Sequence, residues 1–265
     1  MRIIRFEVYR AFHSRTFLVS LLIGSFICAF DMIVFCSQVE NAYLHRAWIG
    51  TDDLLNINPV FFVLLPVIAC LPYGGSLYSD MKTGYEKNIC VRASRLDYTF
   101  AKGVAVFLAA FVSVSLPLAL NLFILAGIYP NYIPDAFLNV GGLRIPDRRL
   151  FAALCNAHPA LYSIVFICID GIFAGAISLT SLSLSKAVKS HFTAVVTPMV
   201  IYIVSSTLLF PNDDDPVIGN WSIMDMVNPS PIVTTLWYQM LTVLFVVLII
   251  NIFFIWIFSR KRDVL

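Results

Sequence analysis

Six apolar stretches, each long enough to cross a lipid bilayer as a helix, dominate this sequence. They cover residues 17–36, 60–78, 103–128, 161–184, 192–210 and 236–258. A helix rises about 1.5 Å per residue and the hydrocarbon core is about 30 Å thick, so about 20 apolar residues suffice for one crossing. The stretches are longer and more continuously apolar than the alternating strands of an outer-membrane barrel. We therefore expect an all-α, polytopic membrane protein with six transmembrane helices.

The composition excludes several other classes of protein. Hydrophobic residues make up 59% of the 265 residues and charged residues only 13%, whereas a soluble domain carries about 25% charged residues. Intrinsic disorder requires low hydrophobicity, and a formal net charge of +2 gives no sign of a nucleic-acid partner. The segments between the stretches contain no repeat and no second domain. Residues 1–265 are therefore predicted to form a single transmembrane domain.

The distribution of basic residues predicts the orientation in the membrane. Most of the 18 lysines and arginines lie in the N-terminal segment, in the loops after the second and fourth stretches, and in the C-terminal tail. The opposite side carries an acidic set that includes Asp52, Asp53, Asp213, Asp214 and Asp215. Basic residues concentrate in cytoplasmic segments. Both termini are therefore expected in the cytoplasm.

The first 15 residues have the pattern of a helix that lies along the inner membrane surface. Apolar side chains recur at every third position, and the arginines lie off that line. The residues that define this pattern are Arg2, Ile3, Arg5, Phe6, Tyr9, Arg10 and Phe12. A solvated basic lead-in is the alternative. The first apolar stretch has the length of a full crossing and no clear cleavage site follows it, so we expect it to remain in the mature chain.

Residues for catalysis or metal binding are not grouped in the sequence. The four histidines lie in different polar segments, and the chain contains no CxxC, HExxH or GxSxG motif. It also has no phosphate-binding loop, so ATP and Mg²⁺ would have to be bound by another subunit. We predict no catalytic residue, no metal site and no cofactor in this chain. Cys36 and Cys155 are both expected outside, and spacing alone leaves their pairing open.

Two acidic residues lie inside apolar stretches, where a buried carboxylate costs several kcal/mol unless it faces protein or water. Asp31 is in the outer half of the first stretch, and Asp170 is close to the middle of the fourth. Asp170 either lines a substrate path or makes a hydrogen bond that ties two helices together. Gly171 and Gly175 follow it with the spacing that allows close helix contact, either within the chain or with a second subunit.

The longest cytoplasmic loop, residues 79–102, reads SDMKTGYEKNICVRASRLDYTFAK. Tyr85 and Ile89 are spaced as neighbours on a helix, and Lys82 and Glu86 form an opposite-charge pair with the same spacing. This pattern predicts a short helix beneath the membrane. Such a helix can dock into a groove on a soluble partner.

This loop resembles the first cytoplasmic loop of the permease subunits of type-2 ABC exporters, which include bacitracin-resistance, lantibiotic-immunity and sodium-export permeases. The residues that carry the resemblance are Asp80, Lys82, Thr83, Gly84, Lys87, Asn88, Ser94, Arg95, Tyr98 and Lys102. One position departs from the pattern, because Tyr85 follows Gly84 where many relatives have threonine. Elsewhere the resemblance is architectural: a basic N-terminal helix, six crossings and both ends inside.

The resemblance implies a permease that pairs with a second permease copy or paralogue and with two copies of a cytosolic ABC ATP-binding subunit, which hold ATP and Mg²⁺. The residues that would couple the chain to this ATPase are Asp80, Lys82, Gly84, Tyr85, Glu86, Lys87, Asn88 and Arg95. The expected function is export of an antimicrobial peptide or other amphipathic compound across a bacterial plasma membrane. An integral membrane enzyme acting on lipid, or a sensory or substrate-binding membrane subunit, are the alternatives.

Overall fold

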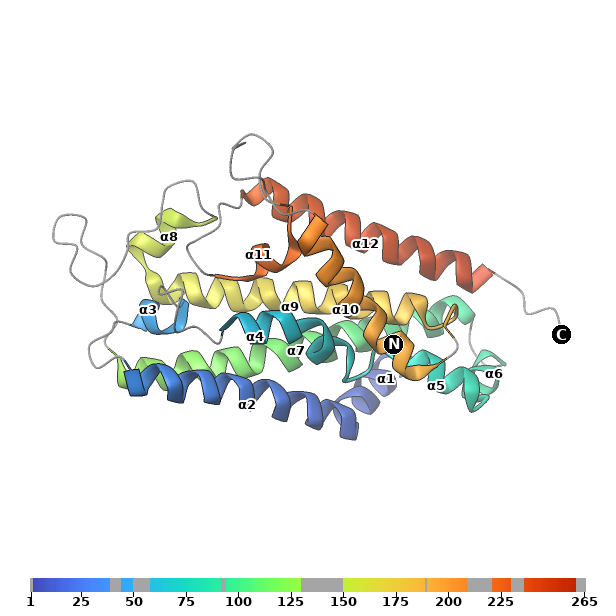
Figure 1. The fold of residues 1–265 in the computed structure, drawn as a ribbon. Coiled ribbons are helices and arrows are strands. Elements are labelled where there is room, and N and C mark those ends of the chain that lie inside the picture. The colour runs from blue at the N-terminus through green and yellow to red at the C-terminus, as the bar shows by residue number, and fades with distance from the viewer. Residues whose placement is uncertain are drawn as a thin grey trace.

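The computed structural model describes residues 2–38, 44–49, 58–91, 94–129, 150–188, 190–208, 221–229 and 236–260. Within these ranges every regular element is an α-helix (Figure 1). Four helices are long and apolar enough to cross a membrane: α2 (Arg15–Gln38), α7 (Arg95–Ile128), α9 (Pro159–Leu184) and α12 (Trp237–Arg260). The predicted all-α fold is confirmed for the described residues, with four helices of full crossing length.

The helices form an elongated bundle around α9. Helix α7 packs most extensively against α9, α12 also packs against α9, and α2 packs against α7 (Figure 1). Their outer faces expose large apolar side chains such as Phe26, Phe123 and Phe245, which are 72%, 78% and 65% exposed. Soluble proteins rarely expose so much contiguous apolar surface, so these faces fit contact with lipid.

Two shorter apolar helices also pack on α9: α4 (Asn58–Cys70) and α10 (His191–Leu208). The stretch at residues 60–78, which is predicted to cross the membrane, is interrupted by a turn at residues 71–75. Pro72 disfavours the helical conformation in the residue before it. Within the turn, a Cβ on Gly74 would lie 2.6 Å from the Cys70 carbonyl oxygen, so no larger residue fits.

The two ends of the bundle differ in structure. At one end, α1 (Arg2–Phe12) lies beside α5 (Ser76–Lys82) and α6 (Tyr85–Cys90) (Figure 1). Helices α5 and α6 form a helical hairpin, so we call this the hairpin end. At the other end lie α3 (Leu44–Ile49) and α8 (Ala152–Ala157), with α11 (Ile223–Val227) packed between α10 and α12.

The contact between α7 and α9 depends on two glycines. A Cβ on Gly171 would lie 2.6 Å from the ring of Phe111, and one on Gly175 would lie 2.5 Å from the ring of Phe107. The absence of side chains therefore allows the rings of α7 to lie directly on the backbone of α9. The close neighbour of this glycine pair belongs to the same chain.

We predict that Gly175→Ala lowers the free energy of unfolding by about 1–3 kcal/mol, because the added methyl group overpacks the contact with Phe107. Gly127→Ala on α7 is the matched control, since its Cβ would meet nothing within 4 Å. The control should leave stability unchanged or raise it by up to about 1 kcal/mol through helix propensity. Unfolding in mixed detergent micelles measures both variants, and equal stabilities would contradict the packing described.

Candidate functional site

Four charged side chains meet at the hairpin end of the bundle: three are buried, and the Arg10 side chain is 36% exposed. Glu7 and Arg10 come from α1, Asp80 from α5 and Lys102 from the second turn of α7. Glu7 and Lys102 are 0% exposed and Asp80 is 1% exposed. Two positive and two negative charges make this group neutral overall. We call it the buried charge cluster.

Asp80 lies at the centre of the buried charge cluster. The Arg10 guanidinium donates from Nη2 to Asp80 Oδ1 at 2.6 Å and from Nη1 to Oδ2 at 3.2 Å, a bidentate arrangement. Lys102 Nζ donates to Asp80 Oδ2 and lies 3.6 Å from Glu7 Oε2. A single carboxylate thus connects α1, α5 and α7.

Three tyrosines surround the same charges. The Tyr73 hydroxyl donates to Glu7 Oε2 at 2.8 Å, and the Tyr98 hydroxyl donates to Asp80 Oδ2. Lys102 Nζ lies 5.3 Å from the centre of the Tyr73 ring and donates to the Tyr98 oxygen at 3.0 Å. The ring of Tyr85, on α6, lies 4.6 Å below the Arg10 guanidinium. These cation–π contacts extend the cluster into the hairpin.

The electrostatics of the cluster keep Asp80 and Arg10 charged. Burial alone would raise the pKa of Asp80, but the Arg10 guanidinium and the Lys102 ammonium outweigh burial and hold that pKa below its ordinary value. Burial alone would lower the pKa of Arg10, yet its hydrogen bond to the Asp80 carboxylate gives a net increase. At neutral pH the Arg10–Asp80 pair is therefore fully ionised.

Helices α5 and α6 form a tight hairpin that turns at Gly84. Gly84 has a φ of +72°, in the left-handed region that favours glycine, and it directly precedes α6. Because this turn separates Lys82 from Glu86, the pair predicted on a single helix is wrong. Glu86 instead lies 3.3 Å from Lys186, which follows the end of α9. The hairpin is therefore bound to α9 as well as to α1.

The structure divides the residues predicted to couple to an ATPase into two groups. Asp80 is buried in the charge cluster, and Tyr85 and Glu86 are half-buried in contacts to Arg10 and Lys186. The exposed members are Lys82, Lys87, Asn88 and Arg95. One face of the hairpin is thus fixed to the bundle while the other presents polar and basic side chains to solvent.

The residues predicted to form an interfacial helix do form a helix, α1. Arg5, Phe6 and Tyr9 are exposed, as a helix on a membrane surface requires, and the Arg2 side chain lies outside the described residues. Arg10 belongs to the same predicted helix, and its half-buried guanidinium donates to the Asp80 carboxylate.

Sequence reasoning missed Glu7 and Tyr73. Glu7 is the only acidic residue in the first 15 positions and lies one helical turn before Arg10. An acidic side chain on an otherwise basic surface helix was a signal that this position faces inward. Tyr73 gave no comparable signal, because its partner is 66 positions away in the sequence.

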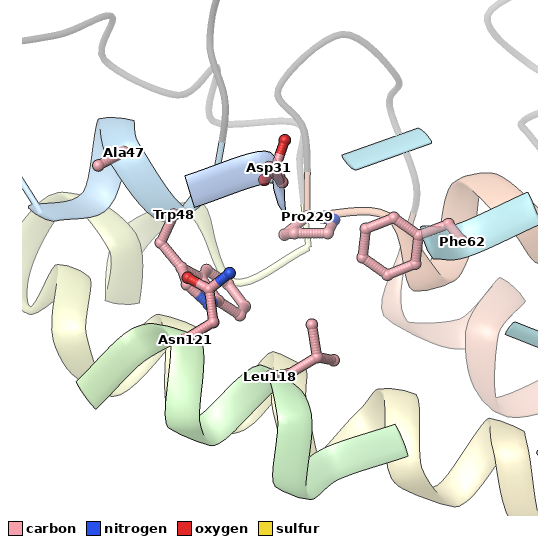
Figure 2. Close-up of a pocket in the computed structure, with 7 residues that line it drawn as sticks. All are labelled: Asp31, Ala47, Trp48, Phe62, Leu118, Asn121 and Pro229. Carbon is pink, nitrogen blue, oxygen red and sulfur yellow. The ribbon is translucent and has the colours of Figure 1, made fainter. Parts of the chain in front are cut away.

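The two acidic residues inside the apolar stretches lie in different surroundings. Asp170 is fully buried, and neither carboxylate oxygen has a hydrogen-bond partner, so the hydrogen bond between two helices, one of the two alternatives for this residue, is not formed. Asp31 is half-buried and lines a small cavity (Figure 2). The other residues that line this cavity are Ala47, Trp48, Phe62, Leu118, Asn121 and Pro229.

The cysteines and potential metal ligands form no further site in the described part of the chain. All six cysteines are free thiols, including Cys36 and Cys155, so the disulfide that spacing left open is not formed. The described residues contain no group of three or more side chains suited to a metal ion.

Comparisons with known proteins give no relative: no family model, no curated protein and no solved structure matches the chain. The functional argument therefore rests on the residues and contacts described above.

Proposed function

We propose that the chain is the transmembrane permease subunit of an ATP-driven ABC exporter, in which the α5–α6 hairpin transmits movement from an ATP-binding subunit. One observation carries this proposal. The hairpin exposes Lys82, Lys87 and Asn88, while Asp80, Tyr85 and Glu86 fix it to α1, to α7 and to the turn after α9. An element of this kind can receive a push from outside and pass it to the bundle.

The physical basis of transmission is the cost of separating buried charges. Removing one partner from a buried ion pair leaves an uncompensated charge, at about 3–5 kcal/mol. The hairpin therefore cannot move away from α1 and α7 without losing that energy, and the three elements move as one body. Packed helices that shift between two discrete arrangements are the usual means of such switching.

The architecture we propose has six crossings. Helices α4 and α10 pack on α9 beside the four long helices and complete the set, with α4 continued by the turn at residues 71–75. The hairpin, α1 and both termini then lie on the cytoplasmic side of a bacterial plasma membrane. Two ATP-binding subunits hold ATP and Mg²⁺, a second permease copy or paralogue completes the pathway, and the cargo is an antimicrobial peptide or other amphipathic compound.

Site-specific photo-crosslinking in the native host tests this proposal. A photoreactive residue in place of the exposed Asn88 on α6 is expected to capture an ATP-binding protein that contains a phosphate-binding loop. The same residue in place of Ala157, which is exposed on α8 at the opposite end of the bundle, is the matched control and should capture none. Capture of that protein from both positions, or from neither, contradicts the proposal.

A further inference from the structure

Asp170 is an acidic side chain in the middle of the most buried of the four long helices. It lies eleven residues after Pro159 and fourteen before Leu184, which is about 16 Å and 21 Å from the two ends of α9. The side chain is 0% exposed, and neither Oδ1 nor Oδ2 accepts or donates a hydrogen bond. The buried charge cluster and its tyrosines do not involve this residue.

Helix α7 provides no charge at the level of Asp170. Gly171 of α9 lies against Phe111 of α7, and Gly175 lies against Phe107. Asp170 therefore lies beside the part of α7 that follows Phe107 by more than one helical turn. Gly103 lies close to Leu179 and Leu182 of α9. Lys102 is therefore roughly ten residues of α9, or about 15 Å, from Asp170 in the direction of the hairpin end. The other ionisable groups of α7 precede Lys102 and lie farther away still.

The remaining helices packed on α9 are also neutral beside Asp170. Between residues 60 and 70, α4 contains no charged side chain, and its Cys70 thiol donates to the Ile177 carbonyl. On α10 the Tyr202 hydroxyl donates to the Phe62 carbonyl at 3.1 Å. The other ionisable residue of α10, His191, is the first residue of that helix. Helix α12 has Tyr238 in its first turn and Arg260 at its last residue.

The shorter elements complete this inventory of ionisable groups. Tyr162 and Cys168 belong to α9 itself, Cys155 to α8, and Tyr78, Asp80 and Lys82 to α5. Helices α3 and α11 contain His45, Arg46 and Asp225, whose side chains lie outside the described residues. No described cation is thus in reach of Asp170. An isolated carboxylate in such a place costs several kcal/mol, whereas a protonated carboxyl group does not carry that charge.

We propose that Asp170 is a proton-binding site in the core of the transmembrane domain. Its carboxyl group holds a proton while the helices are packed as described, and it releases that proton when their movement admits water. In the release step the carboxyl O–H bond breaks, water takes the proton, and a carboxylate remains; the reverse occurs on closing. The release step rests on the proposed transport cycle, whereas the bound proton does not.

Infrared spectroscopy of the full-length chain in lipid nanodiscs tests the bound proton directly. At neutral pH an aspartic acid in water is ionised, so a protonated carboxyl band that shifts on isotope labelling of aspartate identifies an unusual residue. We expect one such band in the unmodified protein and its loss in Asp170→Asn. Asp97→Asn is the control, because Asp97 is exposed, and it should leave the band intact. The labelled unmodified protein gives a result even where a variant fails to fold.

Two spectroscopic outcomes would overturn the proposal. One is the absence of any label-sensitive protonated band at neutral pH, and the other is a band that persists in correctly folded Asp170→Asn. The release step is tested in vesicles that contain the complex with its ATPase and a pH-sensitive dye inside. ATP should cause a transient release of protons that Asp170→Asn abolishes, and an equal release in the variant would overturn that step. Failure to recover an ATPase would contradict the proposed function and leave the infrared result standing.

Discussion

Lys102→Met is expected to lower the free energy of unfolding by about 3–5 kcal/mol, the cost of leaving buried charge without its partner. Lys102 is 0% exposed and lies between the carboxylates of Asp80 and Glu7, 3.6 Å from Glu7 Oε2. Its removal leaves two buried negative charges with Arg10 as their single described cation. Unfolding of the purified protein in mixed micelles, by thermal or detergent titration, measures the loss.

Two matched variants separate this effect from a general loss of lysine. Lys82→Met removes an exposed lysine from α5 and should change stability by no more than about 0.5 kcal/mol. Combining Lys102→Met with Glu7→Gln removes one charge of each sign, so the double variant should regain part of the lost stability. A loss in Lys102→Met no larger than that in Lys82→Met would show that the charges do not form the cluster.

Replacing Tyr85 by Ala and Glu86 by Gln together is expected to reduce the coupling between ATP hydrolysis and transport about 5- to 30-fold. Tyr85 lies 4.6 Å below the Arg10 guanidinium, and Glu86 lies 3.3 Å from Lys186. An exposed cation–π contact contributes about 0.5–1 kcal/mol and a part-exposed ion pair about 0.2–1 kcal/mol. Together they amount to about 0.7–2 kcal/mol, and a loss of about 1–2 kcal/mol corresponds to a 5- to 30-fold change in an equilibrium constant.

Cargo-stimulated ATP hydrolysis by the reconstituted complex measures this loss of coupling. Membrane insertion and basal hydrolysis should persist in the double variant, because the buried charge cluster still holds α5 against α7. Val91→Ala is the matched control, since it changes a side chain that is 86% exposed directly after α6. Unchanged stimulation in the double variant would remove the hairpin from the coupling mechanism.

Local sequence patterns predicted the long helices well, because hydropathy is a property of consecutive residues. The stretch 161–184 corresponds to α9 (Pro159–Leu184), and the stretch 236–258 corresponds to α12 (Trp237–Arg260). Hydropathy alone gives no sign of the turn at residues 71–75, where Pro72 and Gly74 lie, because the apolar run continues through it. Average hydropathy does not distinguish a helix from a turn packed inside a bundle.

The candidate site was predicted only in part, because its contacts join residues far apart in the chain. The loop pattern pointed to Asp80 and Tyr85, but their partner Arg10 lies 70 positions from Asp80. How α1 packs across α7 decides which of its side chains face inward, and no local period specifies that packing. The depth of Asp170 in the bundle followed from helix geometry. That its carboxylate has no hydrogen-bond partner depends on how α4, α7, α10 and α12 pack against α9.

The central claim is that this chain works with an ATP-binding subunit, and mild-detergent purification of the tagged chain from its native host tests it most directly. Copurifying proteins are identified by mass, and the eluate is assayed for ATP hydrolysis. We predict a roughly stoichiometric ATP-binding subunit with a phosphate-binding loop and measurable hydrolysis. A chain that elutes alone and without ATPase activity, under conditions that keep known transporters intact, would contradict the claim.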